Sequence, residues 1–179
     1  MRRLIESTLV ALDGVIGEPA AWASEYFDSE AQEKALEQLK ASDAMLMGKH
    51  TYEIFSQTWP NLSGPYPDRM NSIGKYVFSS TLERADWANS TIVRGNVAAE
   101  VAKLKQQDGQ DLVMYGHGPL GETLLAHNLL DELQFAIHPL LVGHGTVLFR
   151  EGKGTTLTLV GTRTLRTGVV ILGYRPVAA

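Results

Sequence analysis

The stretch DLVMYGHGPLG, residues 111–121, joins an apolar run to a glycine-rich turn. Residues 111–115 are typical of a buried parallel strand, and Pro119 suits the first position of a helix that we expect to continue over Glu122–Leu130. At the junction of this strand and this helix, Gly116, Gly118 and Gly121 follow the pattern G-x-G-x-x-G. The stretch therefore predicts a strand–turn–helix unit, which is the building block of an α/β sheet.

Further units of this kind precede the stretch. Apolar runs and helical spacing predict strands over Leu4–Leu12, Ala44–Met47, Lys75–Ser80 and Thr91–Arg94, and helices over Asp28–Lys40, Thr51–Gln57 and Val97–Gln106. We expect Pro60–Pro67, which holds three prolines and a glycine, to be a loop. The N-terminal part of the chain thus reads as alternating strands and helices.

The residues after the stretch have β character instead. A strand is predicted over Glu132–His138, followed by β runs at Val147–Arg150, Thr156–Leu165 and Val169–Arg175 that are separated by glycine-containing turns. Alternating βα units that end in hairpin strands predict one three-layer α/β/α domain over residues 1–179. Its mixed sheet is expected to have antiparallel C-terminal strands.

Composition excludes several classes of function. The 179 residues are 44% hydrophobic and 20% charged, with a formal net charge of -4, which predicts a folded, soluble chain that does not bind nucleic acid. No apolar stretch approaches the roughly 20 residues that span a bilayer. The chain has no cysteine, which excludes disulfides and thiol chemistry and fits a cytoplasmic setting.

Three turns at the ends of predicted strands are compatible with phosphate groups. They are Gly116–Gly121, Gly48-Lys49-His50-Thr51 and Ser79-Ser80-Thr81. The carboxyl ends of parallel strands share one edge of a sheet, so the three turns together suit a dinucleotide. Neither a Rossmann nor a Walker A motif is present, because hairpin strands follow Gly121 and Asp43 stands where the first Walker glycine belongs. Each turn taken alone also fits a structural role: a tight glycine turn, a solvated lysine, or a hydroxyl that satisfies a turn.

Other candidate chemistry is weaker. Asp13 follows the first strand and is a candidate acid or a turn residue. Trp22, Tyr26 and Phe27 could stack on a planar heterocycle or pack in the core. The five histidines lack metal-ligand spacing, so we expect no metal site, and no G-x-S-x-G elbow points to a hydrolase.

The order of these motifs resembles the dihydrofolate reductase-like superfamily. The closest resemblance is to single-domain relatives of the reductase half of the bifunctional riboflavin-biosynthesis enzyme of bacteria. The matching segments span nearly the whole chain and are Ser7–Ile16, Met47–Glu53, Lys75–Leu82, Gly116-His117-Gly118 with Leu124, Leu130–Leu133 and Pro139–Gly145.

In that superfamily the cofactor is NADPH, and the resemblance implies a role for each matching position. It assigns the pyrophosphate and the 2′-phosphate to Gly48, Lys49, His50 and Thr51. It places the adenosine end beside Ser79, Ser80 and Thr81. It places the central phosphates over the turn of Gly116, His117, Gly118, Pro119 and Leu120, whose backbone N–H groups, other than at Pro119, would donate to them. It places the nicotinamide against Val15 and Ile16. The family often has arginine where Lys49 stands; because lysine lacks the bidentate fork, the preference for NADPH over NADH stays open.

The implied activity is hydride transfer from the nicotinamide to a C=N or C=O carbon of a small heterocycle, such as a pterin or a pyrimidine. Asp13 or water would supply the proton. Asp28 lies near the place where folate reductases have an acidic anchor, but its surroundings do not match. Relatives are commonly homodimers, so a homodimer is expected. Two other hypotheses are a dinucleotide-binding protein without turnover and a structural or partner-binding α/β domain.

Overall fold

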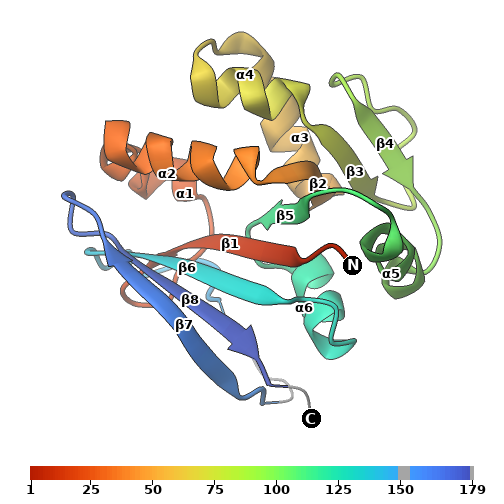
Figure 1. The fold of residues 1–179 in the computed structure, drawn as a ribbon. Helices are drawn as coiled ribbons and strands as arrows, with labels where there is room; N and C mark the ends of the chain where they lie inside the picture. The colour runs from red at the N-terminus through yellow and green to blue at the C-terminus, as the bar shows by residue number, and fades with distance from the viewer. Residues whose placement is uncertain (149–153, 178–179) are drawn as a thin grey trace.

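The computed structural model describes residues 1–148 and 154–177, and its strands form one eight-stranded sheet in the order β4-β3-β2-β5-β1-β6-β8-β7 (Figure 1). The strands are β1 (Leu4–Ala11), β2 (Ser42–Gly48), β3 (Gly74–Phe78), β4 (Ser90–Val93), β5 (Asp111–Tyr115), β6 (Glu132–His138), β7 (Leu157–Thr164) and β8 (Val170–Pro176). The helices are α1 (Pro19–Trp22), α2 (Ser29–Lys40), α3 (Lys49–Thr58), α4 (Pro65–Ser72), α5 (Val97–Gln106) and α6 (Pro119–Ala126), with 3-10 turns η1 (Ser24–Tyr26) and η2 (Trp59–Asn61).

The strand directions confirm the predicted mixed sheet. From β4 to β6 every neighbouring pair is parallel, whereas β8 pairs antiparallel with β6 and β7 pairs antiparallel with β8. Most connections between the parallel strands contain helices, as is usual for parallel pairing, whereas residues 79–89 between β3 and β4 form a loop. The final hairpin needs no helix, which explains the β character of the C-terminal sequence.

Side-chain alternation along the central strands creates the three layers. On β2, Ala44 and Leu46 join an apolar cluster with residues of α5 and α6, while Met45 and Met47 join a second cluster with residues of α2, α3 and α4. Both faces of these strands are therefore buried. Each fully buried large apolar side chain stabilises the folded state by up to about 3 kcal/mol. Figure 1 shows α2, α3 and α4 on one side of the sheet and α6 on the other.

The prediction of a loop over Pro60–Pro67 is wrong at its end, because α4 begins at Pro65. The N–H groups of the first helical turn have no acceptor within the helix, so Pro65 and Pro67 do not interrupt it. Buried Tyr66 and Met70 then hold α4 against the core. Reading prolines as loop residues overlooked their tolerance at a helix start.

Smaller differences concern the ends of elements. The helix after β5 begins at Pro119, as expected, but it ends at Ala126 and not at Leu130, and Asn128 just beyond it has a φ of 55°. In the β run predicted at Val147–Arg150, Val147 forms one isolated bridge to Val15, and residues 149 and 150 lie outside the described residues.

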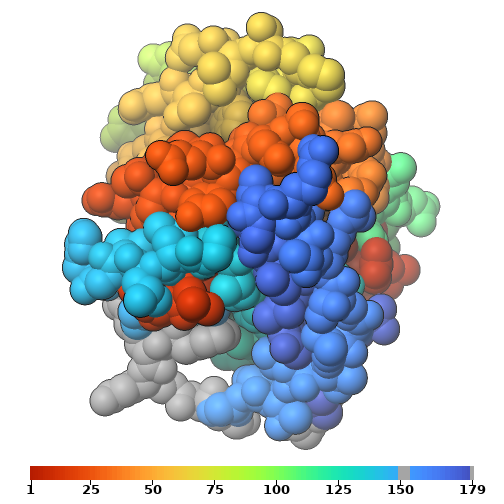
Figure 2. All heavy atoms as spheres, turned by 90° about the vertical axis from the view of Figure 1, so that its left-hand side faces the viewer, coloured from red at the N-terminus to blue at the C-terminus, as the bar shows by residue number. Residues whose placement is uncertain are grey.

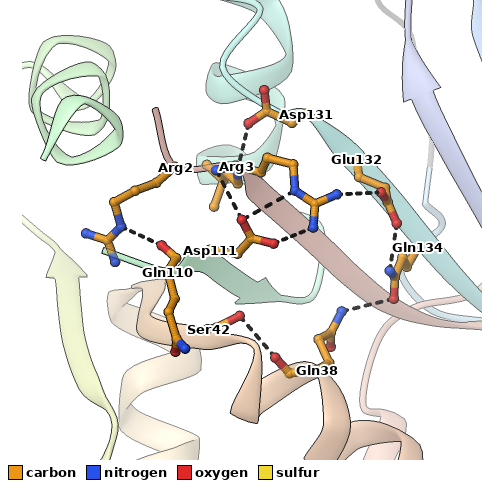
Figure 3. Close-up of polar contacts among 10 residues, drawn as sticks. Arg2, Arg3, Gln38, Ser42, Gln110, Asp111, Asp131, Glu132 and Gln134 are labelled. Carbon is orange, nitrogen blue, oxygen red and sulfur yellow. Dashed lines mark hydrogen bonds and ion pairs between the residues drawn. The ribbon is translucent and has the colours of Figure 1, made fainter. Parts of the chain in front are cut away.

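A polar network ties together the edge at which the parallel strands begin (Figure 3). Arg3, just before β1, forms an ion pair with Asp111 at the start of β5 and lies 3.8 Å from Glu132 at the start of β6. From Glu132 the network continues through Gln134 to Gln38 on α2, with hydrogen bonds of 2.8 and 2.9 Å. Ligands of α/β sheets bind at the opposite edge, so this network is structural.

Asp131→Ala is expected to lower the free energy of unfolding by about 2 kcal/mol. The carboxylate accepts the Leu4 N–H at 2.7 Å and pairs with Lys105, whose side chain is 6% exposed. Removing it leaves a buried ammonium with the Leu129 carbonyl as its remaining acceptor. Urea denaturation measures the loss, with Asp86→Ala as the control because that carboxylate forms an exposed pair. Equal losses in the two variants would contradict the assignment.

Candidate cofactor site

The three phosphate-compatible turns end neighbouring strands. Gly48, Lys49, His50 and Thr51 follow β2; Ser79, Ser80 and Thr81 follow β3; and Gly116, His117, Gly118, Pro119 and Leu120 follow β5. Because β3, β2 and β5 are adjacent and parallel, all three turns lie along the same edge of the sheet. That edge is where α/β sheets bind their ligands.

Lys49 joins the first turn to the second. Its Nζ lies 3.3 Å from the Thr81 hydroxyl and 3.7 Å from a carboxylate oxygen of Glu53, one helical turn further along α3. The Lys49 side chain is 43% exposed, so its charge remains accessible to an anion. His50 is exposed beside it. Cationic and hydroxyl groups thus line the space between the ends of β2 and β3.

The loop after β3 is braced by a residue that the sequence analysis did not single out. Arg94, just after β4, donates hydrogen bonds to the carbonyls of Ser80 at 2.9 Å and Leu82 at 2.7 Å. The Ser79 hydroxyl accepts the N–H groups of Thr81 at 3.2 Å and Leu82 at 2.9 Å. The Ser79 hydroxyl therefore satisfies backbone groups of its own turn, which is the structural role that the sequence left open for this residue. Arg94 also lines a cavity of about 360 Å³ between β4 and α5.

Two helices begin at this edge without a side-chain cap. Gly48 is the N-cap of α3 and Gly118 is the N-cap of α6, and neither helix start has a capping side chain among the described residues. The first N–H groups of such helices point outward and, with the helix dipole, favour an anion. Gly116 has a φ of +79°, a backbone conformation that favours glycine and that turns the chain from β5 into α6.

The segment with Val15 and Ile16 is held by the loop after β6. Val15 is 4% exposed and bridges Val147, and the Ile16 N–H donates to the Thr146 carbonyl at 2.8 Å. Ile16 and Leu120 pack against the same apolar cluster, so this segment and the start of α6 lie on one side of the sheet. Figure 2 shows red atoms of the N-terminal segment directly against the cyan atoms of the chain after β6.

Asp13 braces the same loop. Its carboxylate accepts the Gly143 N–H at 2.7 Å, and this hydrogen bond lowers the pKa of the exposed Asp13 carboxyl below its ordinary value. A carboxyl with a lowered pKa is ionised at neutral pH and is a weak proton donor. The position of Asp13 therefore explains the order of the loop more directly than it explains proton transfer.

The aromatic residues near α1 pack on one another. The rings of Trp22 and Tyr26 both meet the buried His138 ring edge-on at 5.3 Å, and Phe27 contacts Tyr66 of α4 at 5.5 Å. Burial lowers the pKa of His138. The packing alternative thus accounts for these contacts, and His138 is a residue that only the fold brings into this group. Within the described residues, no three His, Asp or Glu side chains are arranged to hold a metal ion.

The strand order and the place of the three turns define a protein of the dihydrofolate reductase-like α/β fold. It belongs to the RibD C-terminal domain family, whose model matches residues 2–171. The chain is 31% identical over 97% of its length to YyaP, an uncharacterized protein of Bacillus subtilis strain 168, and covers 94% of that protein. The resemblance seen in the sequence motifs is thereby confirmed.

Solved structures share the fold. A Shewanella sp. PV-4 protein matches with a TM-score of 0.78 at 19% identity, over 98% of this chain and 99% of that one. The Thermotoga maritima diaminohydroxyphosphoribosylaminopyrimidine deaminase/5-amino-6-(5-phosphoribosylamino)uracil reductase matches with a TM-score of 0.70 at 14% identity. The match covers 98% of this chain and 57% of the Thermotoga chain. No helix of the described residues is long and apolar enough to cross a membrane.

Proposed function

We propose that this protein is an NADPH-dependent reductase that transfers a hydride to a C=N or C=O carbon of a small heterocycle. The observation that carries the proposal is the alignment of three phosphate-compatible turns on adjacent parallel strands, with Lys49 joined to Thr81 across two of them. Membership of the RibD C-terminal domain family supports a reductase-like activity.

The donor set fits a phosphorylated dinucleotide. The N-termini of α3 and α6 offer uncapped N–H groups, and Lys49 supplies a positive charge between them and the loop after β3. In the proposed complex Lys49, His50 and Thr51 bind the pyrophosphate and the 2′-phosphate. Ser80 and Thr81 flank the adenosine end, where Arg94 keeps their loop in place.

A bound nicotinamide would supply the hydride, and the chain would supply alignment and exclusion of water. In the proposed complex Val15 and Ile16 form the apolar wall beside the nicotinamide. Asp13 accepts the Gly143 N–H and so braces the loop that holds this segment. The direct donation of a proton by Asp13 stays a prediction. Of the two proton sources that the sequence left open, water is favoured because the Asp13 carboxyl has a lowered pKa.

The substrate class follows from the family and stays a proposal. The Thermotoga relative is named as a pyrimidine deaminase and uracil reductase, which favours a pyrimidine-like substrate over a pterin. A homodimer is proposed as well, because β7 is the edge strand of the sheet and exposes Leu159 and Val160. Sedimentation of the purified protein measures its oligomeric state.

Tryptophan fluorescence tests the cofactor. Trp22, Trp59 and Trp87 are the natural donors, and titration with NADPH and then NADH is expected to quench their emission saturably. Oxidation of bound NADPH when a pyrimidine, pterin or carbonyl acceptor is added distinguishes a reductase from a binding protein without turnover. If neither nucleotide binds, the turns are structural features and the proposed function is wrong.

A further inference from the structure

A carboxylate is buried in the middle of β1, beneath the turn that follows β5. Glu6 is 0% exposed and lies on the sheet face that packs against α5 and α6, among the apolar residues of that cluster. Its Oε1 is 2.8 Å from His117 Nδ1 and 3.4 Å from the Thr8 hydroxyl. Its Oε2 is buried without a hydrogen-bond partner in the described part of the chain. A buried carboxylate in such surroundings is stabilised chiefly by its pairing with a cation.

The backbone of α6 is shaped around this pair. A Cβ atom on Gly121 would lie 2.5 Å from Glu6 Oε2 and 2.9 Å from His117 Nδ1. Both contacts are closer than a side chain allows, so the glycine lets the helix approach the two groups. The side chain of His117 is only 4% exposed, although the residue stands in a turn at the sheet edge. The imidazole therefore points inward, toward β1.

The pair stands directly behind the turn that is proposed to cover the cofactor phosphates. His117 lies between Gly116, which has a positive φ, and Gly118, the N-cap of α6. We infer that Glu6 is a positioning residue: it holds a positively charged His117 under the Gly116–Gly118 turn, and this charge strengthens the binding of phosphate at the start of α6. The inference rests on the proposed function, because it concerns the same turn.

The charges around His117 support this role. Burial acts to lower the pKa of His117, but the hydrogen bond and charge of Glu6, together with the charge of Glu122 on α6, raise it above its ordinary value. His117 is thus more often protonated near neutral pH than a free histidine. A cation near the first N–H groups of α6 adds to the attraction that the helix dipole exerts on an anion. Raising the pH removes the proton and weakens that attraction.

The test is the pH dependence of NADH binding, measured by fluorescence titration from pH 6 to pH 9. NADH is the appropriate probe because NADPH carries a 2′-phosphate monoester that itself titrates, with a pKa of about 6. In the wild type, Kd is expected to rise about fivefold across the range as His117 loses its proton. In Glu6→Gln the side chain keeps its size but loses its charge, so the rise should move to lower pH.

A matched control and a second variant separate positioning from simple stability. His127→Gln changes a histidine at the C-terminal end of the same helix and should keep the wild-type profile. His117→Asn removes this imidazole, so Kd should rise less across the pH range than in the wild type, because His50 at the proposed phosphate site is present in both proteins. NMR titration of the His117 imidazole should show its pKa lower in Glu6→Gln than in the wild type.

The outcomes are distinct. If Glu6→Gln weakens binding equally at every pH and leaves the profile in place, Glu6 has only a structural role and the inference is wrong. A wild-type Kd that does not change with pH overturns it too, while leaving the proposed function intact. The absence of NADH and NADPH binding at every pH would overturn both.

Discussion

Lys75→Ala is expected to lower the free energy of unfolding by about 3 kcal/mol. Lys75 is 1% exposed, and its Nζ donates to the carbonyls of Asn71 at 3.0 Å, Ile73 at 2.8 Å and Ala88 at 3.0 Å. The same ammonium lies 4.2 Å from the centre of the Trp87 ring. Alanine leaves three carbonyls without this donor and a cavity where the methylene chain packed. Chemical denaturation with urea at pH 7 measures the loss.

The same lysine predicts a pH dependence of stability. Burial, with a smaller contribution from the charge of Arg69, lowers the pKa of Lys75 from 10.5 to about 8. Between these two pH values the unfolded chain binds more protons than the folded one. The contribution of Lys75 to the free energy of unfolding therefore rises with pH. The difference in stability between the wild type and Lys75→Ala should therefore grow from pH 8 to pH 10.

Lys103→Ala is the control for both measurements. Lys103 lies on the surface of α5 and pairs with Glu100, so its loss should change stability by less than about 0.5 kcal/mol at either pH. If Lys75→Ala behaves like this control, the ammonium is not supporting the loop between β3 and β4.

Lys75 also shows where sequence reasoning ends. The strand that contains Lys75 was predictable from the apolar pattern of its residues, and the three turns at the strand ends and the antiparallel hairpin after Glu132–His138 were predictable too. These features depend on local patterns of side chains and glycines. The interaction of Lys75 with the carbonyls of Asn71 and Ala88 depends on how the end of α4 meets the loop between β3 and β4, and a pattern along one strand carries no information about that.

The same limit applies to the candidate site. The residues of the three turns follow from motif and position, but Arg94 reaches the loop after β3 from a different strand. Glu6 had one usable signal, a single acidic residue within an otherwise β-rich apolar run. Its partner His117 is more than a hundred positions away in the chain, and only the parallel pairing of β1 with β5 brings the two together.

Lys49→Ala is expected to weaken NADPH binding about tenfold, which corresponds to about 1.4 kcal/mol. Its ammonium lies between the start of α3 and Thr81, where the proposed function places the cofactor phosphates. The effect is moderated because the side chain is 43% exposed and water screens its charge. Fluorescence titration with NADPH and NADH in parallel measures it. A loss confined to NADPH assigns Lys49 to the 2′-phosphate, whereas an equal loss for both assigns it to the pyrophosphate.

Two further substitutions at the same place should not weaken NADPH binding, in contrast to Lys49→Ala. Glu53 lies 3.7 Å from Lys49 Nζ and competes with a phosphate for it, so Glu53→Gln should tighten NADPH binding about twofold. Lys49→Arg keeps the charge and adds a guanidinium fork that can bind a phosphate with two hydrogen bonds, so it should preserve or tighten binding. If Lys49→Ala, Lys49→Arg and Glu53→Gln all bind NADPH as the wild type does, while the wild type binds saturably, the phosphates lie elsewhere on the sheet edge. The assignment of the turn after β2 would then be wrong.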